Sequence, residues 1–456
     1  MVALDLLVVT TSLDSMRRDL GADATDLQWA VTAYGVTFAS MLMAGAALGD
    51  RFGRRRMLVV GLGVFVAGSA LAALAPGVGF LLCARVVQGC GGAIIVPVSL
   101  AMVVAASPVD QRGAAIGTLE GVTGLAVIAG PVVGGVVTQQ LSWQWVFWMN
   151  VPVGLLAIVC VLVIVPESRG EHRSVDVVGT VLVTGAAFAS VWGLTRGNGA
   201  GWASGEVVGA LIAAAVLAAA FAWWQTRAPR PMLDPRHFRS RQFRAGVVAA
   251  ALLSAALYGS VFFMAQMLQI SLDLDPIGAG LRLLPWTATL LLVAPLAGRL
   301  SDRVGVRPVL LAGLVATSGG FAWLAATVEP GIGYAHLLGP LIVTGVGLSA
   351  SLPVSQVAVI GSVHSDEVGA AAGTVNVLQE LGGAFGVAVA VAVFLANGGY
   401  TDRGGTTAAI GAAFVACAVM AAAAALAASA LPRTGHSFRA DRAGDEFDLG
   451  SGSTQV

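Results

Sequence analysis

The sequence predicts an all-α integral membrane protein, and three observations carry that prediction. The chain is 57% hydrophobic and only 11% charged over 456 residues, and its mean hydropathy is +0.84. Apolar runs of roughly 20 residues, long enough to cross a hydrocarbon core of about 30 Å as helices, recur along the whole sequence. A soluble domain of this length could not bury so much apolar surface, so the chain is expected to lie in a lipid bilayer.

The apolar runs predict fourteen membrane-spanning helices, each with boundaries good to about four residues. The spans are expected near residues 2–13, 27–49, 57–75, 80–104, 114–138, 146–165, 177–195, 206–225, 245–270, 277–299, 308–327, 335–360, 370–396 and 406–431. The first is short, because only about a dozen residues precede Asp14, against about 20 needed to cross. Either the true start lies upstream or this helix is abbreviated.

The arginines set the expected orientation. All 25 basic residues are arginine, and with the N-terminus in the cytoplasm nineteen of them fall on the cytoplasmic side, five outside and Arg85 within a span. This follows the positive-inside rule and predicts a multi-pass protein of the cell (cytoplasmic) membrane with both termini cytoplasmic. Residues 1–20 lack a basic region and a cleavage site, so no signal peptide is predicted.

Composition also argues against other classes of partner. The formal net charge is zero and the basic residues lie in short clusters between spans, so no nucleic-acid surface is expected. No CxxC spacing is found among the four cysteines, which lie inside apolar segments, so neither a disulfide framework nor a zinc site is expected. These are Cys83, Cys90, Cys160 and Cys417.

A charged loop occurs twice in the sequence. The pattern L-x-D-R-x-G-x-R begins at Leu48 and again at Leu300, each time where an apolar span ends on the expected cytoplasmic side. A loop repeated at matching places in two halves is what a parallel-repeat transporter shows, with its substrate site between the halves near the midplane.

These loops resemble the signature between helices two and three of the major facilitator superfamily and its repeat in the second half. The first copy departs once, with Ala46 where the family has glycine. The resemblance implies a gate that closes the cytoplasmic side through charge pairing and helix-end contacts. That gate would comprise Asp50, Arg51, Gly53, Arg54, Asp302, Arg303 and Gly305. Alternatively, Arg54–Arg56 only anchor the topology, which is the simpler interpretation for Arg56.

Further motifs resemble the fourteen-helix drug:proton antiporter branch of that superfamily. Leu82-x-x-Arg85-x-x-Gln88-Gly89-x-Gly91 is similar to the fourth-helix motif whose arginine is implicated in proton coupling. The fifth span holds an antiporter-like motif, with Ala126 replacing its middle glycine; its members here are Gly117, Gly130, Pro131, Gly134 and Gly135. Three segments resemble the fourteen-helix branch in particular: Leu4-Asp5-x2-Val8-Val9, Leu27-Gln28-Trp29 with Tyr34, and Trp143-x-Trp145-x-Phe147-x2-Asn150-Val-Pro152.

The resemblance implies a major facilitator fold of two six-helix bundles plus two extra central helices. The expected parts are an N-terminal bundle (1–165), the two extra helices (166–226), a cytoplasmic linker (227–244), a C-terminal bundle (245–431) and a disordered cytoplasmic tail (432–456). It also implies a monomer that exchanges a small-molecule substrate for protons among membrane lipids, with the proton gradient as its energy source and no cofactor.

Four ionisable residues are expected inside the bilayer: Asp5, Arg85, Glu120 and Glu380. Each is a candidate proton-coupling residue, because an ionisable side chain at mid-span costs about 2.5–3.5 kcal/mol on insertion scales. Glu120 lies roughly 10 Å and Glu380 roughly 15 Å inside their spans, both on faces of small or polar residues. A buried carboxyl is easier to protonate than one in water, and it could exchange its proton for a cationic ligand.

Each of these residues also has a structural interpretation. A carboxyl could be kept neutral, or could pair with Arg85, simply to hold helices together. Arg85 begins only about five residues into its span and could reach the interface as an anchor. The position of Asp5 depends on the true start of the chain. Function is favoured for Glu380, and the two interpretations are balanced for Glu120.

Aromatic and amide side chains within the spans are candidates for an adaptable substrate cavity. They could bind flat amphipathic compounds by stacking and cation–π contact, although helix packing explains any single one equally well. The candidates are Trp29, Tyr34, Tyr258, Phe262, Gln266, Asn376 and Gln379. Trp143, Trp145 and Trp148 fall at the outer end of a span, where an interfacial aromatic belt is expected.

The sequence therefore predicts a proton-driven exporter of hydrophobic or amphipathic small molecules such as drugs and antibiotics. A second hypothesis keeps the fold and makes the cargo an endogenous metabolite or lipid precursor. A membrane enzyme is disfavoured because the five histidines are dispersed and form no catalytic or metal cluster. A non-transporting sensor is a remote alternative, since no stretch is long enough for a folded soluble domain.

Overall fold

In the part of the chain that it describes, the computed structural model contains helices and no strands. The described residues are 24–168, 176–229, 231, 235–274, 276–364, 367–400 and 403–432, together with Met1, Val2, Asp5, Val8, Val9, Ser12, Ser15, Met16 and 19–21. Side chains at 24–28, 31, 127–140, 262, 276, 277 and 403 are outside this description.

The helices follow one another along the chain with short connections. Their order is α2 (Ala24–Phe52), α3 (Arg54–Ala73), α4 (Val78–Ala106), η1 (Val109–Gln111), α5 (Arg112–Gln140), α6 (Gln144–Trp148), α7 (Asn150–Ile164), α8 (Val177–Ala200), α9 (Gly205–Gln225), η2 (Pro235–Arg239), α10 (Arg241–Leu272), α11 (Pro276–Arg282), α12 (Leu284–Val304), α13 (Val306–Thr327), α14 (Tyr334–Ile360), α15 (Val368–Ala396) and α16 (Arg403–Ser429).

Thirteen of the fourteen predicted spans have a helical counterpart in the described residues. Eleven helical segments are long and apolar enough to cross a membrane, with α6 and α7 together making one of them. Two more predicted spans, 114–138 and 277–299, correspond to α5, which has 29 residues, and to α11 followed by the 21-residue α12. The remaining span, 2–13, falls mostly on residues outside the description. The chain is a multi-pass membrane protein with an all-α fold.

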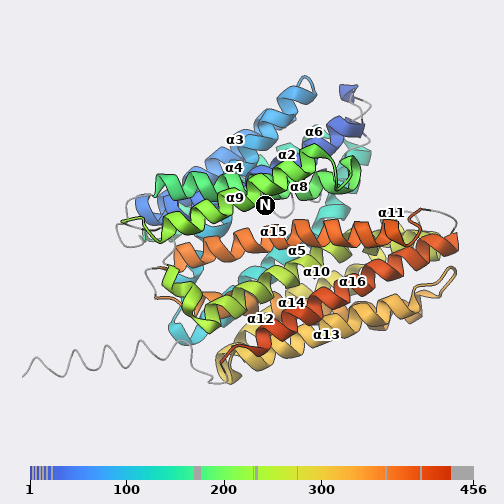
Figure 1. Ribbon diagram of the computed structural model, residues 1–456. Coiled ribbons are helices and arrows are strands. Elements are labelled where there is room, and N and C mark those ends of the chain that lie inside the picture. The colour runs from blue at the N-terminus through green and yellow to red at the C-terminus, as the bar shows by residue number, and fades with distance from the viewer. Residues whose placement is uncertain are drawn as a thin grey trace, which may run out of the picture.

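The helices pack in two groups that follow the order of the chain (Figure 1). In the first group α2 and α3 pack on α4, and α3 also contacts α6 and α7. In the second group α10 packs on α14, α15 and α16, while α13 and α14 pack on each other. A large core of buried apolar side chains, including Leu253, Phe321 and Phe414, holds the second group together.

Two pairs of helices form the longest connections between the groups. The long interface between α5 and α12 is one connection, and α2 against α15 is the other. Glycine allows the α5/α12 interface to be close, because a Cβ at Gly298 would collide with the backbone of Gly113. The hairpin of α8 and α9 packs with α8 against both α2 and α15, so it covers the second connection (Figure 1).

One end of the helices carries most of the arginines and is named here the arginine-rich end. It includes the α2–α3 and α12–α13 connections, with Asp50, Arg54, Asp302 and Arg303. At this end the two groups meet in an apolar cluster, in which Val104 of α4 and Ile116 of α5 pack with Val357 of α14. The two groups are therefore in contact at the arginine-rich end.

Candidate functional site

The two repeated loops make related backbone turns. Gly53 separates α2 from α3 and Gly305 separates α12 from α13, and their φ angles are +103° and +94°. Residues other than glycine rarely adopt such positive φ angles, which explains why both copies of the pattern place glycine there. Each turn brings the preceding aspartate to the surface where the two helix groups meet.

The aspartate of the second loop caps a helix of the first group. The carboxylate of Asp302 accepts hydrogen bonds from the backbone N–H groups of Gly113, at 2.9 Å, and Ala114, at 2.8 Å. These two N–H groups belong to the first turn of α5, where backbone donors are unpaired and a negative charge is favourable. Asp302 is half-buried, and this burial raises the pKa of its carboxyl while the two backbone N–H groups lower it.

The aspartate of the first loop takes a related position. Asp50 lies at the start of α15, where its carboxylate occupies the space into which a side chain at Gly369 would project. Arg54 is 4% exposed and donates from Nη2 to the same carboxylate at 2.9 Å. Arg51 and Arg303 are exposed, and Arg51 packs over the ring of Phe52. Arg54 is therefore a predicted gate arginine that contacts its aspartate.

A glutamate outside the sequence motifs completes this end. Glu167, just after α7, accepts from the backbone N–H of Arg55 at 3.0 Å and from that of Arg56 at 3.3 Å. It therefore caps α3 as Asp302 caps α5. No local pattern around Glu167 indicates this role, because its partners lie more than 110 residues earlier in the chain.

A fully buried polar network lies inside the first group. Asp5 and Arg85 are both 0% exposed, and Nη1 of Arg85 lies 2.5 Å from Oδ2 of Asp5. The other carboxylate oxygen of Asp5 accepts from Asn150 at 2.7 Å and from Gln88 at 3.2 Å. Gln88 also donates to Ser69 at 2.7 Å and accepts from Arg85 at 2.9 Å. Two charges buried so deeply require such partners.

Aromatic rings cover Arg85. The guanidinium carbon lies 4.4 Å from the ring centroid of Tyr34 and 5.8 Å from that of Phe147. Tyr34 is itself fully buried, so in this conformation it packs on the network and does not line an open cavity. Arg85 is fully buried among these partners and does not reach the surface of the protein, which argues against its interpretation as an anchor.

The acidic residue of α15 is less enclosed. Glu380 is partly exposed and accepts a long hydrogen bond, 3.5 Å, from the hydroxyl of Tyr258 on α10. Asn376 lies one turn earlier on the same face of α15, and its buried Nδ2 has no hydrogen-bond partner in the described part of the chain. The charges of both Asp5 and Glu380 act on Tyr34 of α2.

The acidic residue of α5 bridges the two groups. Oε1 of Glu120 accepts from Nε2 of Gln356 on α14 at 2.9 Å. Within the described residues the amide oxygen of Gln356 is buried without a partner. The pair is therefore a polar contact between the first and second groups inside the bilayer.

The remaining predicted cavity residues are dispersed. Trp29 stacks on Trp192 of α8 with ring centroids 4.8 Å apart, and Gln266 accepts from the hydroxyl of Tyr400 at 2.7 Å. Gln379 is buried on α15. The side chain of Phe262 lies outside the described residues. The surroundings of Gly130, Pro131, Gly134 and Gly135 in α5 lie outside them too.

The tryptophan motif at α6 does more than form a belt. Trp143 is 2% exposed and its indole N–H donates to Asp19 at 2.7 Å, so it is a buried helix contact. Trp145 is half exposed, as a belt residue would be. Asn150 of the same motif is the residue that donates to Asp5. In the described part of the chain, no group of three His, Cys, Asp or Glu side chains could hold a metal ion.

Membrane-crossing helices in two groups, with buried charges within and between them, are typical of a membrane transporter. The chain belongs to the Major Facilitator Superfamily, whose sequence profile it matches over residues 1–288 and 247–451. It is a transporter and not an enzyme.

Several relatives have names that refer to resistance or export. The chain is 34% identical over 393 residues to the tetracenomycin C resistance and export protein of Streptomyces glaucescens, covering 85% of this chain and 72% of the relative. It is 32% identical over 404 residues to the multidrug resistance protein Stp of Mycobacterium tuberculosis, covering 87% of this chain and 74% of that relative. The puromycin resistance protein pur8 of Streptomyces alboniger is 33% identical over 413 residues, covering 88% and 82%.

Solved structures of the same superfamily share the fold. The human organic anion transporter MFSD10 superposes with a TM-score of 0.64 at 15% identity, covering 94% of this chain and 96% of that one. The proton:xylose symporter XylE superposes with a TM-score of 0.64 at 15% identity, covering 93% and 91%. At such low identity these likenesses concern the fold alone.

Proposed function

We propose that this transporter exports hydrophobic or amphipathic small molecules, drugs and antibiotics among them, in exchange for protons by alternating access. The observation that carries the proposal is the buried network around Asp5, in which Arg85, Gln88 and Asn150 all donate to one carboxylate. A proton arriving at Asp5 would displace at least one of these donors. Proton binding there would change the contacts of Asp5 with α4 and α7.

The surroundings of Glu380 support the proposal that the proton and the cargo compete for its carboxylate. Glu380 is less enclosed than Asp5 and accepts a long hydrogen bond from the hydroxyl of Tyr258. The buried Nδ2 of Asn376, which has no partner within the described residues, lies one turn away. An aromatic ring beside a carboxylate suits a cargo with a cationic or polar head on a flat apolar body. Such a cargo beside Glu380 would favour the ionised carboxylate, and protons entering from outside would displace it.

The orientation follows from the arginines. We place the arginine-rich end in the cytoplasm of a cell-membrane protein with both termini on that side, because nineteen of the 25 arginines then face inward. Asp302 and Asp50 each lie at the start of a helix from the other group. These contacts would then close the cytoplasmic side in this conformation. Residues 1–165 and 245–431 would act as two moving bundles of a monomer, with 166–226 between them.

The transport experiment uses purified protein in liposomes with an imposed pH gradient. The panel is tetracenomycin C, puromycin and lipophilic cationic dyes, and the readout is substrate-driven proton movement. Wild type is compared with Asp5→Asn, Glu380→Gln and Glu120→Gln. Glu206→Gln is the matched control, because Glu206 pairs with Arg196 at a partly exposed site between α8 and α9.

The expected result is movement of at least one compound that depends on the gradient and is lost in Asp5→Asn and Glu380→Gln. The control variant should transport like wild type. If no panel compound moves protons in correctly oriented protein, drug export is wrong. If compounds move equally well without a gradient, proton exchange is wrong.

A dedicated exporter of an endogenous metabolite is the second candidate. The relative from Streptomyces glaucescens is named for both resistance to and export of one compound, and another from Streptomyces coelicolor is a probable actinorhodin transporter. Under this candidate one compound or a close chemical series would be transported and the dyes would not.

A further inference from the structure

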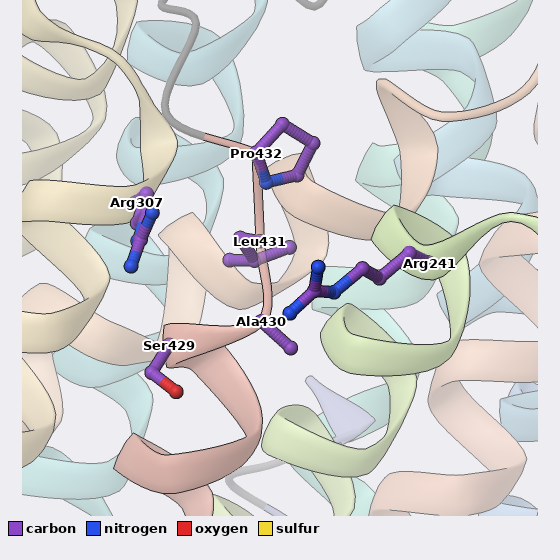
Figure 2. A pocket seen from close by; sticks show the side chains of 6 residues that line it. All are labelled: Arg241, Arg307, Ser429, Ala430, Leu431 and Pro432. Atoms are coloured by element: carbon purple, nitrogen blue, oxygen red, sulfur yellow. The ribbon is translucent and has the colours of Figure 1, made fainter.

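Three helix ends meet around a cavity at the arginine-rich end. Arg241 is the first residue of α10 and Arg307 is the second residue of α13. Ser429 is the last residue of α16, and residues 430–432 follow it. Together they line a cavity of about 550 Å³. Figure 2 shows the two arginine side chains on opposite sides of Leu431, with Ala430 and Pro432 before and after it.

Neither arginine side chain has a hydrogen bond or an ion pair within the part of the chain that the structure describes. The first turns of α10 and α13 contain no acidic residue, and the next charged side chain on α10 is the exposed Arg244. Arg54, Arg85 and Arg196 all have carboxylate partners. The cavity therefore presents two unpaired positive charges.

The C-terminus of α16 accounts for part of this arrangement. Its last carbonyl groups favour a nearby positive charge, and α16 has no basic residue in its own last turn. That interaction does not require a cavity, nor two arginines from two different helices. The apolar side of the cavity, Ala430 and Leu431, is also unsuited to a small free ion.

The level of the cavity relative to the membrane indicates its ligand. Helices α10, α13 and α16 are all long enough to cross the membrane, so the place where they end lies at the level of the lipid headgroups. Guanidinium groups match the oxygens of a phosphate in paired hydrogen bonds. Basic pockets between helix ends on the cytoplasmic side are suited to anionic headgroups.

We propose that this cavity binds the phosphate of an anionic phospholipid from the leaflet that faces the arginine-rich end. Arg241 and Arg307 donate to the phosphate oxygens, and Leu431 contacts the glycerol and the first carbons of the acyl chains. The site would connect α10, α13 and α16 through the lipid. It lies apart from the transport site, and the proposal does not depend on proton exchange.

The chain itself offers a competing anion. Asp441, Asp445, Glu446 and Asp448 follow Pro432 within the last part of the sequence. A carboxylate segment could reach the same arginines, so the experiment must separate the two occupants.

The experiment measures lipid binding to the purified full chain by native mass spectrometry. Phosphatidylglycerol is titrated against phosphatidylcholine, and Arg241→Gln with Arg307→Gln is compared with wild type. The control removes two exposed arginines of the same end, Arg239→Gln with Arg299→Gln. We expect the preference for phosphatidylglycerol to fall about fivefold per arginine removed from the cavity, and to persist in the control.

Three further measurements decide which anion occupies the cavity. A variant ending at Pro432 should keep the preference; if the preference appears only after this truncation, the acidic segment occupies the cavity and the lipid proposal is wrong. Inorganic phosphate at millimolar concentration should not compete; full competition would indicate a free-anion site. Arg241→Lys with Arg307→Lys keeps the charge and should retain part of the preference. Equal loss in the cavity and control variants would indicate a general surface effect and overturn the proposal.

Discussion

Asp302 and Gly113 join the two halves of the transporter through one capped helix start. The carboxylate of Asp302, at the end of α12, accepts from the backbone N–H of Gly113 in the first turn of α5 at 2.9 Å. Asp50, at the related place in the first half, lies beside Gly369 at the start of α15. Each repeated aspartate thus lies at the start of a helix from the opposite half, which gives the internal repeat of the sequence a structural meaning.

Removing this cap should loosen the start of α5. Asp302→Ala leaves the N–H groups of Gly113 and Ala114 without a partner, and loss of such a cap costs about 1–2 kcal/mol. Hydrogen–deuterium exchange of the amides of Gly113 and Ala114 should become roughly tenfold faster, since about 1.4 kcal/mol is a tenfold change in an equilibrium. Asp110→Ala, at an exposed acidic residue just before α5, is the control. Unchanged exchange in Asp302→Ala would mean that the cap does not hold the helix.

The fold could be predicted largely from the sequence, because a helix in lipid must satisfy its own backbone. Each apolar run between charged clusters therefore had to be a helix, and thirteen of the predicted spans have one. The loop pattern around Asp50 and Asp302 predicted where glycine permits a sharp turn. The breaks within spans, such as Met149 between α6 and α7, could not be predicted from hydropathy.

The candidate site could be predicted only in part. Ionisable residues within spans are rare enough to identify one by one, and this selected Asp5, Arg85, Glu120 and Glu380. Their partners could not be predicted, because contacts between helices depend on packing. Asn150 is 145 residues from Asp5, and Gln356 is 236 residues from Glu120. Amides such as these look like ordinary polar residues until the fold brings them together.

The two loop glycines should be irreplaceable for the same backbone reason. Gly53→Ala and Gly305→Ala would each force a side chain into a conformation at φ near +100°, which costs about 1–3 kcal/mol. Thermal unfolding in detergent should show this loss for both variants. Gly63→Ala is the matched control, because Gly63 lies within α3 with no atom within 4 Å of an added Cβ. It should be neutral or slightly stabilising, and equal losses at all three positions would refute the argument.

The buried pair of Asp5 and Arg85 should show strong coupling. Asp5→Asn or Arg85→Gln alone leaves one uncompensated buried charge, which costs about 3–5 kcal/mol. The double variant Asp5→Asn with Arg85→Gln leaves none, so it should lose clearly less than the sum of the two single losses. A double-mutant cycle measured by chemical unfolding in detergent checks this.

Arg196→Gln and Glu206→Gln provide the comparison for that cycle. This pair is 37% and 43% exposed, and exposed pairs contribute about 0–1 kcal/mol. Its coupling should therefore be small. Coupling as small for Asp5 and Arg85 would show that the buried pair is not formed in the membrane protein.

Gln356 should matter for the contact between the halves and not only for stability. In Gln356→Leu the carboxyl of Glu120 loses its amide donor on α14, which should lower stability by about 1–3 kcal/mol. Gln242→Leu is the matched control, because Gln242 on α10 donates to the carbonyl of Ala358 on α14 within one half. Both variants should lose similar stability.

If the bond between Glu120 and Gln356 takes part in alternating access, only Gln356→Leu should change the pH dependence of transport in liposomes. The double variant Glu120→Gln with Gln356→Leu should then behave like Glu120→Gln alone, and independent effects on the pH profile would rule out a shared role.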